Sequence, residues 1–108
     1  MKRKSHLPLT ETVYYILLAL IQPAHGYLIM QNVEELSHGS VRLAAGTLYG
    51  ALETLLKKEL IVALPSKDIR RKVYEISPLG KQVLQADCDR MTHMIRITNQ
   101  QFGGEKDV

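Results

Sequence analysis

Three residues near the start of one predicted helix have the chemistry to contact a nucleic acid. Thr47 and Tyr49 carry hydroxyl groups that can donate hydrogen bonds to phosphates or base edges. Gly50 has no side chain, so it would let the helix backbone approach a partner closely. Thr54 and Lys57 follow on the same polar face. These residue types predict a helix that enters the major groove of duplex DNA, and a core helix with a polar outer face is the alternative.

A polar loop farther along the chain is rich in cations. Lys67, Arg70, Arg71 and Lys72 lie within six residues, together with a single acid, Asp68. Such a loop can follow the sugar-phosphate backbone or probe the minor groove, and a solvated turn is the alternative. We assign Arg70 and Arg71 to the DNA backbone.

Residues for catalysis or metal binding do not form a pattern. The four histidines are scattered without the spacing of metal ligands, and no Gly-rich phosphate loop, carboxylate pair or Ser/His/Asp arrangement stands out. We therefore expect no enzyme activity, no metal and no cofactor. The net charge of +3 permits nucleic-acid binding but does not require it.

The cysteine content and the apolar runs indicate where the protein acts. Cys88 is the single cysteine, so no intrachain disulfide can form, and a reducing cytoplasm fits best. The longest apolar run, Val13 to Ile21, is about half of a membrane span. We expect a cytoplasmic protein without a membrane partner.

Hydrophobic periodicity, caps and breakers predict the elements that position these residues. The expected order is three helices, a two-stranded hairpin and one long helix, over residues 9–21, 26–36, 45–58, 60–64, 72–76 and 78–101. Ile29, Val33 and Leu36 should form the inward face of the second helix. Ser77 and Pro78 are a cap and a first helical residue, which marks the start of the last helix.

This order predicts a mainly α fold with a small β-hairpin. The second and third helices match a helix-turn-helix, and the hairpin stands where a wing would follow. We expect a winged helix-turn-helix DNA-binding domain over residues 1–76, a C-terminal dimerisation helix over 77–102 and a flexible tail over 103–108.

The last helix carries a heptad-spaced stripe that predicts a dimer interface. Its members recur at intervals of four and three residues: Leu84, Cys88, Met91, Ile95, Thr98 and Phe102, of which all but Thr98 are the expected interface residues. A stripe that only covers its own core is the alternative. We favour a homodimer because a terminal helix of this length extends beyond a small core.

The ordered motifs resemble the PadR family of bacterial transcriptional regulators, in particular its short members with one terminal helix. The resemblance covers roughly residues 7 to 102. It rests on these segments: Tyr15-Ile16-Leu17-Leu18-Ala19-Leu20, His25-Gly26-Tyr27-Leu28-Ile29, Gly46-Thr47-Leu48-Tyr49, Leu60-Ile61, Arg71-Lys72-Val73-Tyr74 and Ser77-Pro78-Leu79-Gly80.

The resemblance implies a homodimer joined by its terminal and first helices. It also implies binding to an operator in double-stranded DNA, usually repression, and often release by a small aromatic or drug-like effector. Thr47, Tyr49 and Gly50 would fall in the DNA-facing part of the recognition helix, and Arg70 and Arg71 in the wing.

Two positions depart from the family pattern. Members usually have Gly where this chain has Glu59, so Glu59 would need a left-handed conformation unless the helix ends differently. Members often carry a basic residue at or beside Glu53 and Thr54, and a carboxylate at position 53 would repel phosphates. A winged-helix protein-interaction module that does not bind DNA is therefore the alternative function.

Overall fold

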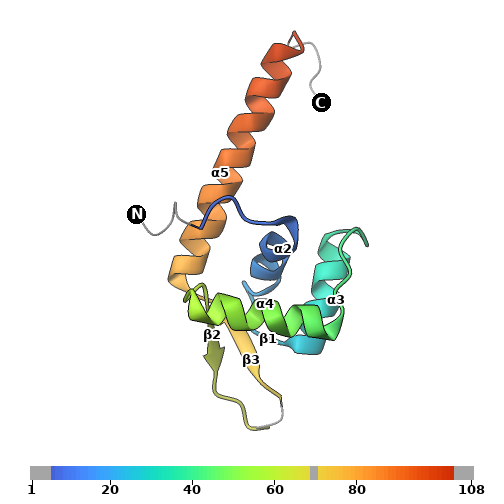
Figure 1. The fold of residues 1–108 in the computed structure, drawn as a ribbon, viewed down its shortest axis with the longest axis vertical. Helices are drawn as coiled ribbons and strands as arrows, with labels where there is room; N and C mark the ends of the chain where they lie inside the picture. Colours follow the sequence, from blue (N-terminus) through green and yellow to red (C-terminus); the bar gives the residue numbers. More distant parts are fainter. Residues whose placement is uncertain (1–5, 69–70, 104–108) are drawn as a thin grey trace.

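The computed structural model describes residues 6–68 and 71–103. The described residues form four α-helices and a small antiparallel sheet, whose hairpin projects at the end of the molecule opposite to the last helix (Figure 1). The elements in chain order are α2 (Glu11–Ala19), β1 (Ala24–His25), α3 (Gly26–Leu36), α4 (Ala45–Lys57), β2 (Ile61–Leu64), β3 (Val73–Ile76) and α5 (Pro78–Gln101). The predicted fold class is confirmed.

Polar side chains cap three of the helices at their first turns. The Thr10 hydroxyl accepts the Val13 amide, and the His25 ring accepts the Leu28 amide at the start of α3. Ser77 caps α5 by accepting the Gly80 amide at 2.9 Å. These caps explain why α3 and α5 have the predicted bounds, whereas α2 begins and ends about two residues inside its predicted range.

The inward face of α3 is one residue shorter than predicted. Ile29 and Val33 are buried, but Leu36 is 46% exposed, so its assignment to the core was wrong. The buried position at this end belongs to Ser37, whose hydroxyl oxygen accepts the Val41 amide at 3.0 Å. The chain turns at that residue, which leaves Leu36 on the outside of the last helical turn.

The sheet has three strands, in the order β1-β3-β2, and not the two that were predicted. Ala24 pairs with Tyr74 and His25 with Val73. β1 therefore lies along the edge of β3 that is opposite β2. The sequence gives no sign of β1 because a strand of two residues is too short to show alternation. Its pairing holds the start of α3 against the base of the wing.

One hydrophobic core joins all the helices to the sheet. Its fully buried members include Leu17 of α2, Ile29 of α3, Leu48 of α4 and Val83 of α5. The Ser77 hydroxyl also donates to the Glu59 carbonyl oxygen at 2.7 Å, which fixes the start of α5 beside the end of α4. The first turns of α5 pack in this core, and the second half of the helix extends away from it (Figure 1).

Helix α4 ends on a non-glycine residue in the left-handed region. Glu59 has φ of 64°, its amide donates to the Leu56 carbonyl oxygen, and the Leu60 amide donates to that of Leu55. This is the Schellman arrangement, which glycine usually closes. The left-handed conformation predicted for Glu59 is therefore observed.

We expect Glu59→Gly to raise the free energy of unfolding by about 0.5–1 kcal/mol, because it removes the Cβ clash of the left-handed conformation. Urea unfolding monitored by circular dichroism measures the change. Glu53→Gly, inside α4, is the control and should lower stability by about 1 kcal/mol. Equal destabilisation by both substitutions would contradict this account of the helix end.

Candidate nucleic-acid interface

Helix α4 buries one face and leaves the predicted DNA-binding face open. Leu48, Leu52 and Leu55 are buried, whereas Thr47 and Gly50 are exposed and Tyr49 is 50% exposed. The N-cap position is Ala44, which provides no side-chain hydrogen bond to the first turn. The first amides of α4 are thus available to an anion, and the helix dipole favours one there.

Thr54 and Lys57 are exposed farther along α4. The Thr54 hydroxyl donates to the Gly50 carbonyl oxygen at 3.2 Å, so its proton is engaged within the helix. Thr54 also lines a cavity with Lys58 and the segment before α2, away from the wing. Thr54 therefore lines a different cavity from the one that Tyr49 lines.

Tyr49 reaches from α4 to the start of α3. A Cβ added to Gly26 would lie 2.7 Å from Tyr49 Cζ and still closer to the phenolic oxygen. The ring therefore occupies space that only a glycine at position 26 leaves free. Gly26 thus sets the position of Tyr49, a role that the sequence did not reveal.

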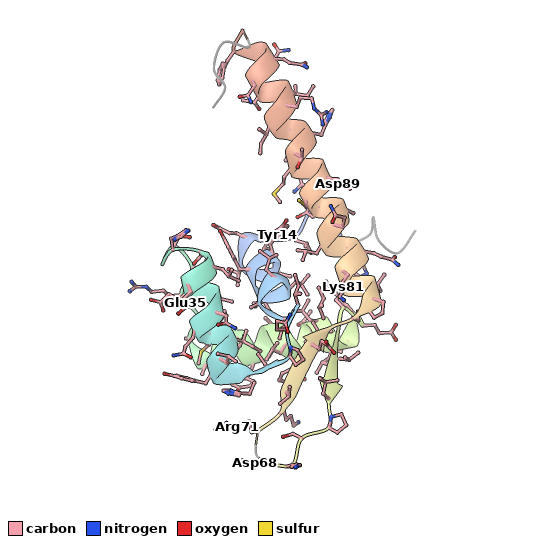
Figure 2. The ribbon with its side chains drawn as sticks, turned by 180° about the vertical axis from the view of Figure 1, so that it is seen from behind. Tyr14, Glu35, Asp68, Arg71, Lys81 and Asp89 are labelled. Atoms are coloured by element: carbon pink, nitrogen blue, oxygen red, sulfur yellow. The ribbon has the colours of Figure 1, made fainter. Side chains whose placement is uncertain are left out.

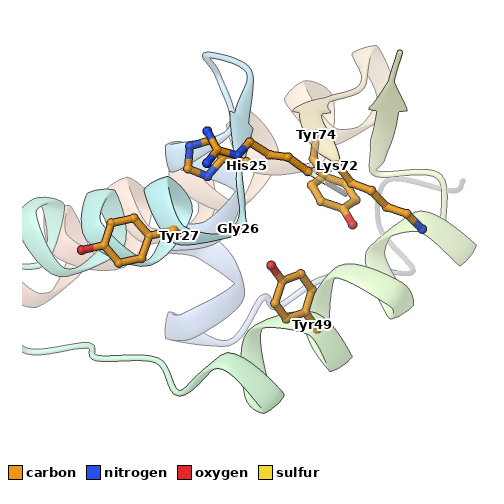
Figure 3. A pocket seen from close by; sticks show the side chains of 7 residues that line it. His25, Gly26, Tyr27, Tyr49, Lys72 and Tyr74 are labelled. Atoms are coloured by element: carbon orange, nitrogen blue, oxygen red, sulfur yellow. The ribbon is translucent and has the colours of Figure 1, made fainter. Parts of the chain in front are cut away.

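A cavity of about 550 Å³ opens between the starts of α3 and α4 and the base of the wing. The side chains of Tyr49 and Tyr74 face it from α4 and β3 (Figure 3). Burial raises the pKa of Tyr74, and the neighbouring Tyr49 raises it further. The full lining is His25, Gly26, Tyr27, Tyr49, Arg71, Lys72 and Tyr74.

The wing brings one predicted arginine to this cavity. Arg71 is exposed at the end of the hairpin (Figure 2), and its amide donates to the Asp68 carbonyl oxygen at 2.9 Å. The other predicted arginine, Arg70, lies outside the described residues. Tyr49 and Arg71 were predicted separately, and the structure places them around one cavity.

Five residues of this cavity, Gly26 among them, were not among the predicted DNA contacts. Lys72 belongs to the cationic run, and His25 and Tyr27 to a motif used for the resemblance, so each had a signal. Tyr74 is a buried sheet residue, and it also belongs to a motif used for the resemblance, Arg71-Lys72-Val73-Tyr74. Pairing of β1 with β3 brings these positions together.

The predicted dimer stripe on α5 changes from buried to exposed along the helix. Leu84 is only 8% exposed and already packs in the core of its own chain. Cys88 and Met91 are half-buried, whereas Ile95 is 62% and Phe102 70% exposed. The surface that remains for a partner lies in the second half of α5.

A buried carboxylate joins α5 to the segment before α2. Asp87 is buried, accepts the Arg90 guanidinium at 2.6 Å and lies 3.4 Å from the Leu9 amide. Beside it, burial raises the pKa of Tyr14 to about 12, and a hydrogen bond with Cys88 contributes. Neither contact was predicted, because Asp87 looks like one more polar residue of an exposed helix face.

Two other kinds of site are not found within residues 6–68 and 71–103. No cluster of His, Cys, Asp or Glu there could hold a metal ion. In the same part of the chain, no helix is both long and apolar enough to cross a membrane.

Comparison with known proteins decides the family. The model of the transcriptional regulator PadR-like family matches residues 15–86, which run from within α2 through the wing to the start of α5. The chain belongs to this family. PadR-like proteins are DNA-binding regulators and not enzymes, in agreement with the absence of catalytic motifs in the sequence.

A curated protein is also similar to this chain. A 37.1 kDa protein in transposon TN4556 of Streptomyces fradiae is 35% identical over 72 residues, which are 67% of this chain but only 20% of that relative. The chain thus spans about a fifth of the length of this curated relative.

Solved structures show the same fold. A transcriptional regulator from Clostridium thermocellum has a TM-score of 0.68 at 25% identity, over 81% of this chain and 88% of that one. A PadR family regulator from Eggerthella lenta has a TM-score of 0.64 at 22% identity, over 96% and 87% respectively.

Substitution of Gly50 should affect stability and ligand binding in opposite directions. A Cβ at this position would meet nothing within 4 Å, so the fold itself does not require glycine there. We expect Gly50→Ala to raise the free energy of unfolding by about 0.5–1 kcal/mol. If a nucleic acid approaches the backbone, the same methyl group should weaken duplex binding about tenfold, or ~1.4 kcal/mol.

Thermal unfolding and fluorescence anisotropy with a labelled duplex measure the two effects of Gly50→Ala on one sample. A more stable variant with unchanged affinity would show that the backbone at Gly50 does not face the duplex.

Proposed function

We propose that this protein is a sequence-specific regulator that binds double-stranded DNA through the exposed face of α4 and the wing. The observation that carries the proposal is the placement of Tyr49 and Arg71 around one cavity. These residues come from a recognition helix and a hairpin, the two elements with which a winged helix reads a groove and holds the backbone.

Thr47, Tyr49 and Gly50 would read the major groove, with Thr54 and Lys57 farther along the same helix. Arg70 and Arg71 would hold the sugar-phosphate backbone. Glu53 is exposed on α4 among these residues. Its carboxylate would repel a DNA phosphate that came close to this position. Base contacts near the start of α4 would then carry the sequence preference.

The protein would act in the cytoplasm as a homodimer on a pseudo-palindromic operator. The exposed apolar residues in the second half of α5 support dimerisation, since Met94, Ile95 and Phe102 gain burial only from a partner. Residues 77–102 would thus be the dimerisation segment. Two-fold symmetry would place two recognition helices about one helical turn of DNA apart.

Repression with release by a small aromatic compound completes the proposal. Two cavities of about 470 and 440 Å³ lie on either side of Tyr14, between α2 and α5. A flat ligand bound there would contact the helix that carries the dimer interface. It could therefore change the distance between the two recognition helices.

DNA from the region upstream of the protein's own coding sequence provides the test. We expect saturable binding of the labelled duplex at 50 mM salt, with an affinity that falls steeply as salt rises. Arg71→Ala should reduce the slope of log affinity against log salt by about two, because each subunit of the dimer loses one phosphate contact. Absence of any complex at low salt would favour the alternative, a winged-helix module that binds protein.

A further inference from the structure

A second cavity, of about 270 Å³, lies between the segment before α2, the second half of α4 and the residue before β2. It shares no lining residue with the cavity around Tyr49. The residues that line it are His6, Pro8, Leu9, Thr10, Val13, Ala51, Thr54, Leu55, Lys58 and Leu60. Only Thr54 of this set is a proposed DNA contact, so most of the cavity has no assigned role.

The apolar part of the lining is aliphatic. Leu55 and Leu60 are buried, and Val13 and Ala51 are half-buried. No Phe, Tyr or Trp is among the lining residues, so the cavity offers no aromatic ring on which a flat ligand could stack. This lining favours a saturated chain, because methylene groups gain free energy by leaving water without any need for a stacking partner.

The polar part of the lining offers a cation and a hydrogen-bond donor. Lys58 is exposed, and its ammonium group forms no ion pair within residues 6–68 and 71–103. The Thr10 hydroxyl accepts the Val13 amide, so its own proton can be donated to a ligand. Thr10 is also the N-cap of α2, where the helix dipole is positive. No Asp or Glu lines the cavity, so an anionic group would meet no like charge there.

We infer that this cavity binds a short aliphatic carboxylate. The saturated chain would cover Ala51 and Leu55, and the carboxylate would lie beside Lys58. The volume is smaller than that of most sites for drug-sized ligands, which limits the chain to a few carbons. This inference does not need the proposed function, because the lining alone determines the ligand.

The bound carboxylate would also regulate duplex binding, and this extension rests on the proposed function. The anion would cancel the charge of Lys58 and lie near Thr54, a proposed DNA contact on the same helix. We expect saturating hexanoate to weaken duplex binding about threefold, because the added negative charge repels phosphates. Hexanol has the same chain without the charge and should leave the duplex affinity unchanged.

Hexanoate tests the cavity without DNA. When it is added to the full chain, we expect saturable shifts of the amide NMR signals of Leu9, Val13, Ala51 and Leu55. Hexanol should bind about fivefold more weakly, because it lacks the ion pair with Lys58. Butanoate should bind about tenfold more weakly, because it buries two fewer methylene groups.

Two lysine variants locate the carboxylate. Lys58→Met keeps a long side chain without the charge, and it should weaken hexanoate binding about fivefold while leaving hexanol binding unchanged. Lys57→Met is the matched control for hexanoate binding, because Lys57 is the adjacent exposed lysine of α4 and does not line the cavity. Ala51→Leu should weaken the binding of both ligands by filling the cavity, and circular dichroism verifies that this variant folds.

The outcomes separate this inference from the proposed function. Hexanoate shifts that are absent, or equal affinities for hexanoate and hexanol, or equal losses in Lys58→Met and Lys57→Met, would overturn the carboxylate site. Hexanoate binding with an unchanged duplex affinity would overturn the regulatory extension alone. Hexanoate binding as expected, without any duplex complex at low salt, would support the carboxylate site while overturning the proposed function.

Discussion

Ile95→Glu is expected to convert the protein from dimer to monomer and to weaken binding to a duplex with two half-sites by about 10²–10⁴-fold. Ile95 is 62% exposed on α5, and a second subunit of the proposed dimer would cover it. A buried glutamate without a partner is strongly unfavourable, so the interface should not form around it. Each monomer would then bind one half-site without the gain from the linked second site.

Ile97→Glu is the matched control for Ile95→Glu. Ile97 is the same residue type on the same helix and is also exposed. It lies two residues after Ile95, so its side chain is rotated by about 200° around the helix axis and points to a different face of α5. We expect Ile97→Glu to leave the dimer intact. Sedimentation velocity measures the state of assembly, and fluorescence anisotropy measures the duplex affinity. If the two variants dissociate equally, the heptad stripe does not define the interface.

Gly80→Ala should lower the free energy of unfolding by about 2–3 kcal/mol, a large share of the stability of a small domain. A Cβ at Gly80 would press on the Leu60 carbonyl oxygen and lie 2.7 Å from Ile76 Cγ1. The contacted atom of Leu60 belongs to the backbone, so rotation of a side chain cannot relieve the clash with the new Cβ. The start of α5 would have to move away from the sheet.

Gly46→Ala is the control for Gly80→Ala. Gly46 is also a helical glycine, but a Cβ there would meet nothing within 4 Å. Its substitution should therefore not lower the free energy of unfolding, and should raise it by up to about 1 kcal/mol, as at Gly50. Chemical denaturation of both variants measures the difference. Equal stability of the two variants would show that α5 is not packed tightly against Leu60.

The sequence predicted the elements whose ends carry strong local signals. The Ser77 cap with Pro78 determines the start of α5, and the apolar periodicity of α3 and α4 determines their buried faces. The predicted strands differ by one residue at their starts, because Leu60 and Lys72 lie just before β2 and β3. In these elements, local propensity and tertiary packing favour the same structure.

The features that were missed depend on contacts between distant segments. β1 exists only because Tyr74 and Val73 offer a free strand edge, and Leu36 is exposed because Ser37 takes the buried position. The cavity around Tyr49 combines residues from α3, α4 and the wing. No single stretch of sequence contains the information that Gly26 positions Tyr49.

The most direct test of the central claim is to map the amide NMR signals that respond to duplex DNA from the region upstream of the coding sequence. The proposed interface predicts the largest changes at Thr47, Tyr49 and Gly50 of α4 and at Arg71 of the wing. The polar end of α3, with Glu34 and Glu35, should change little. Changes confined to α5 or to the end of α3, with α4 and the wing unaffected, would contradict a winged helix-turn-helix that binds DNA through α4.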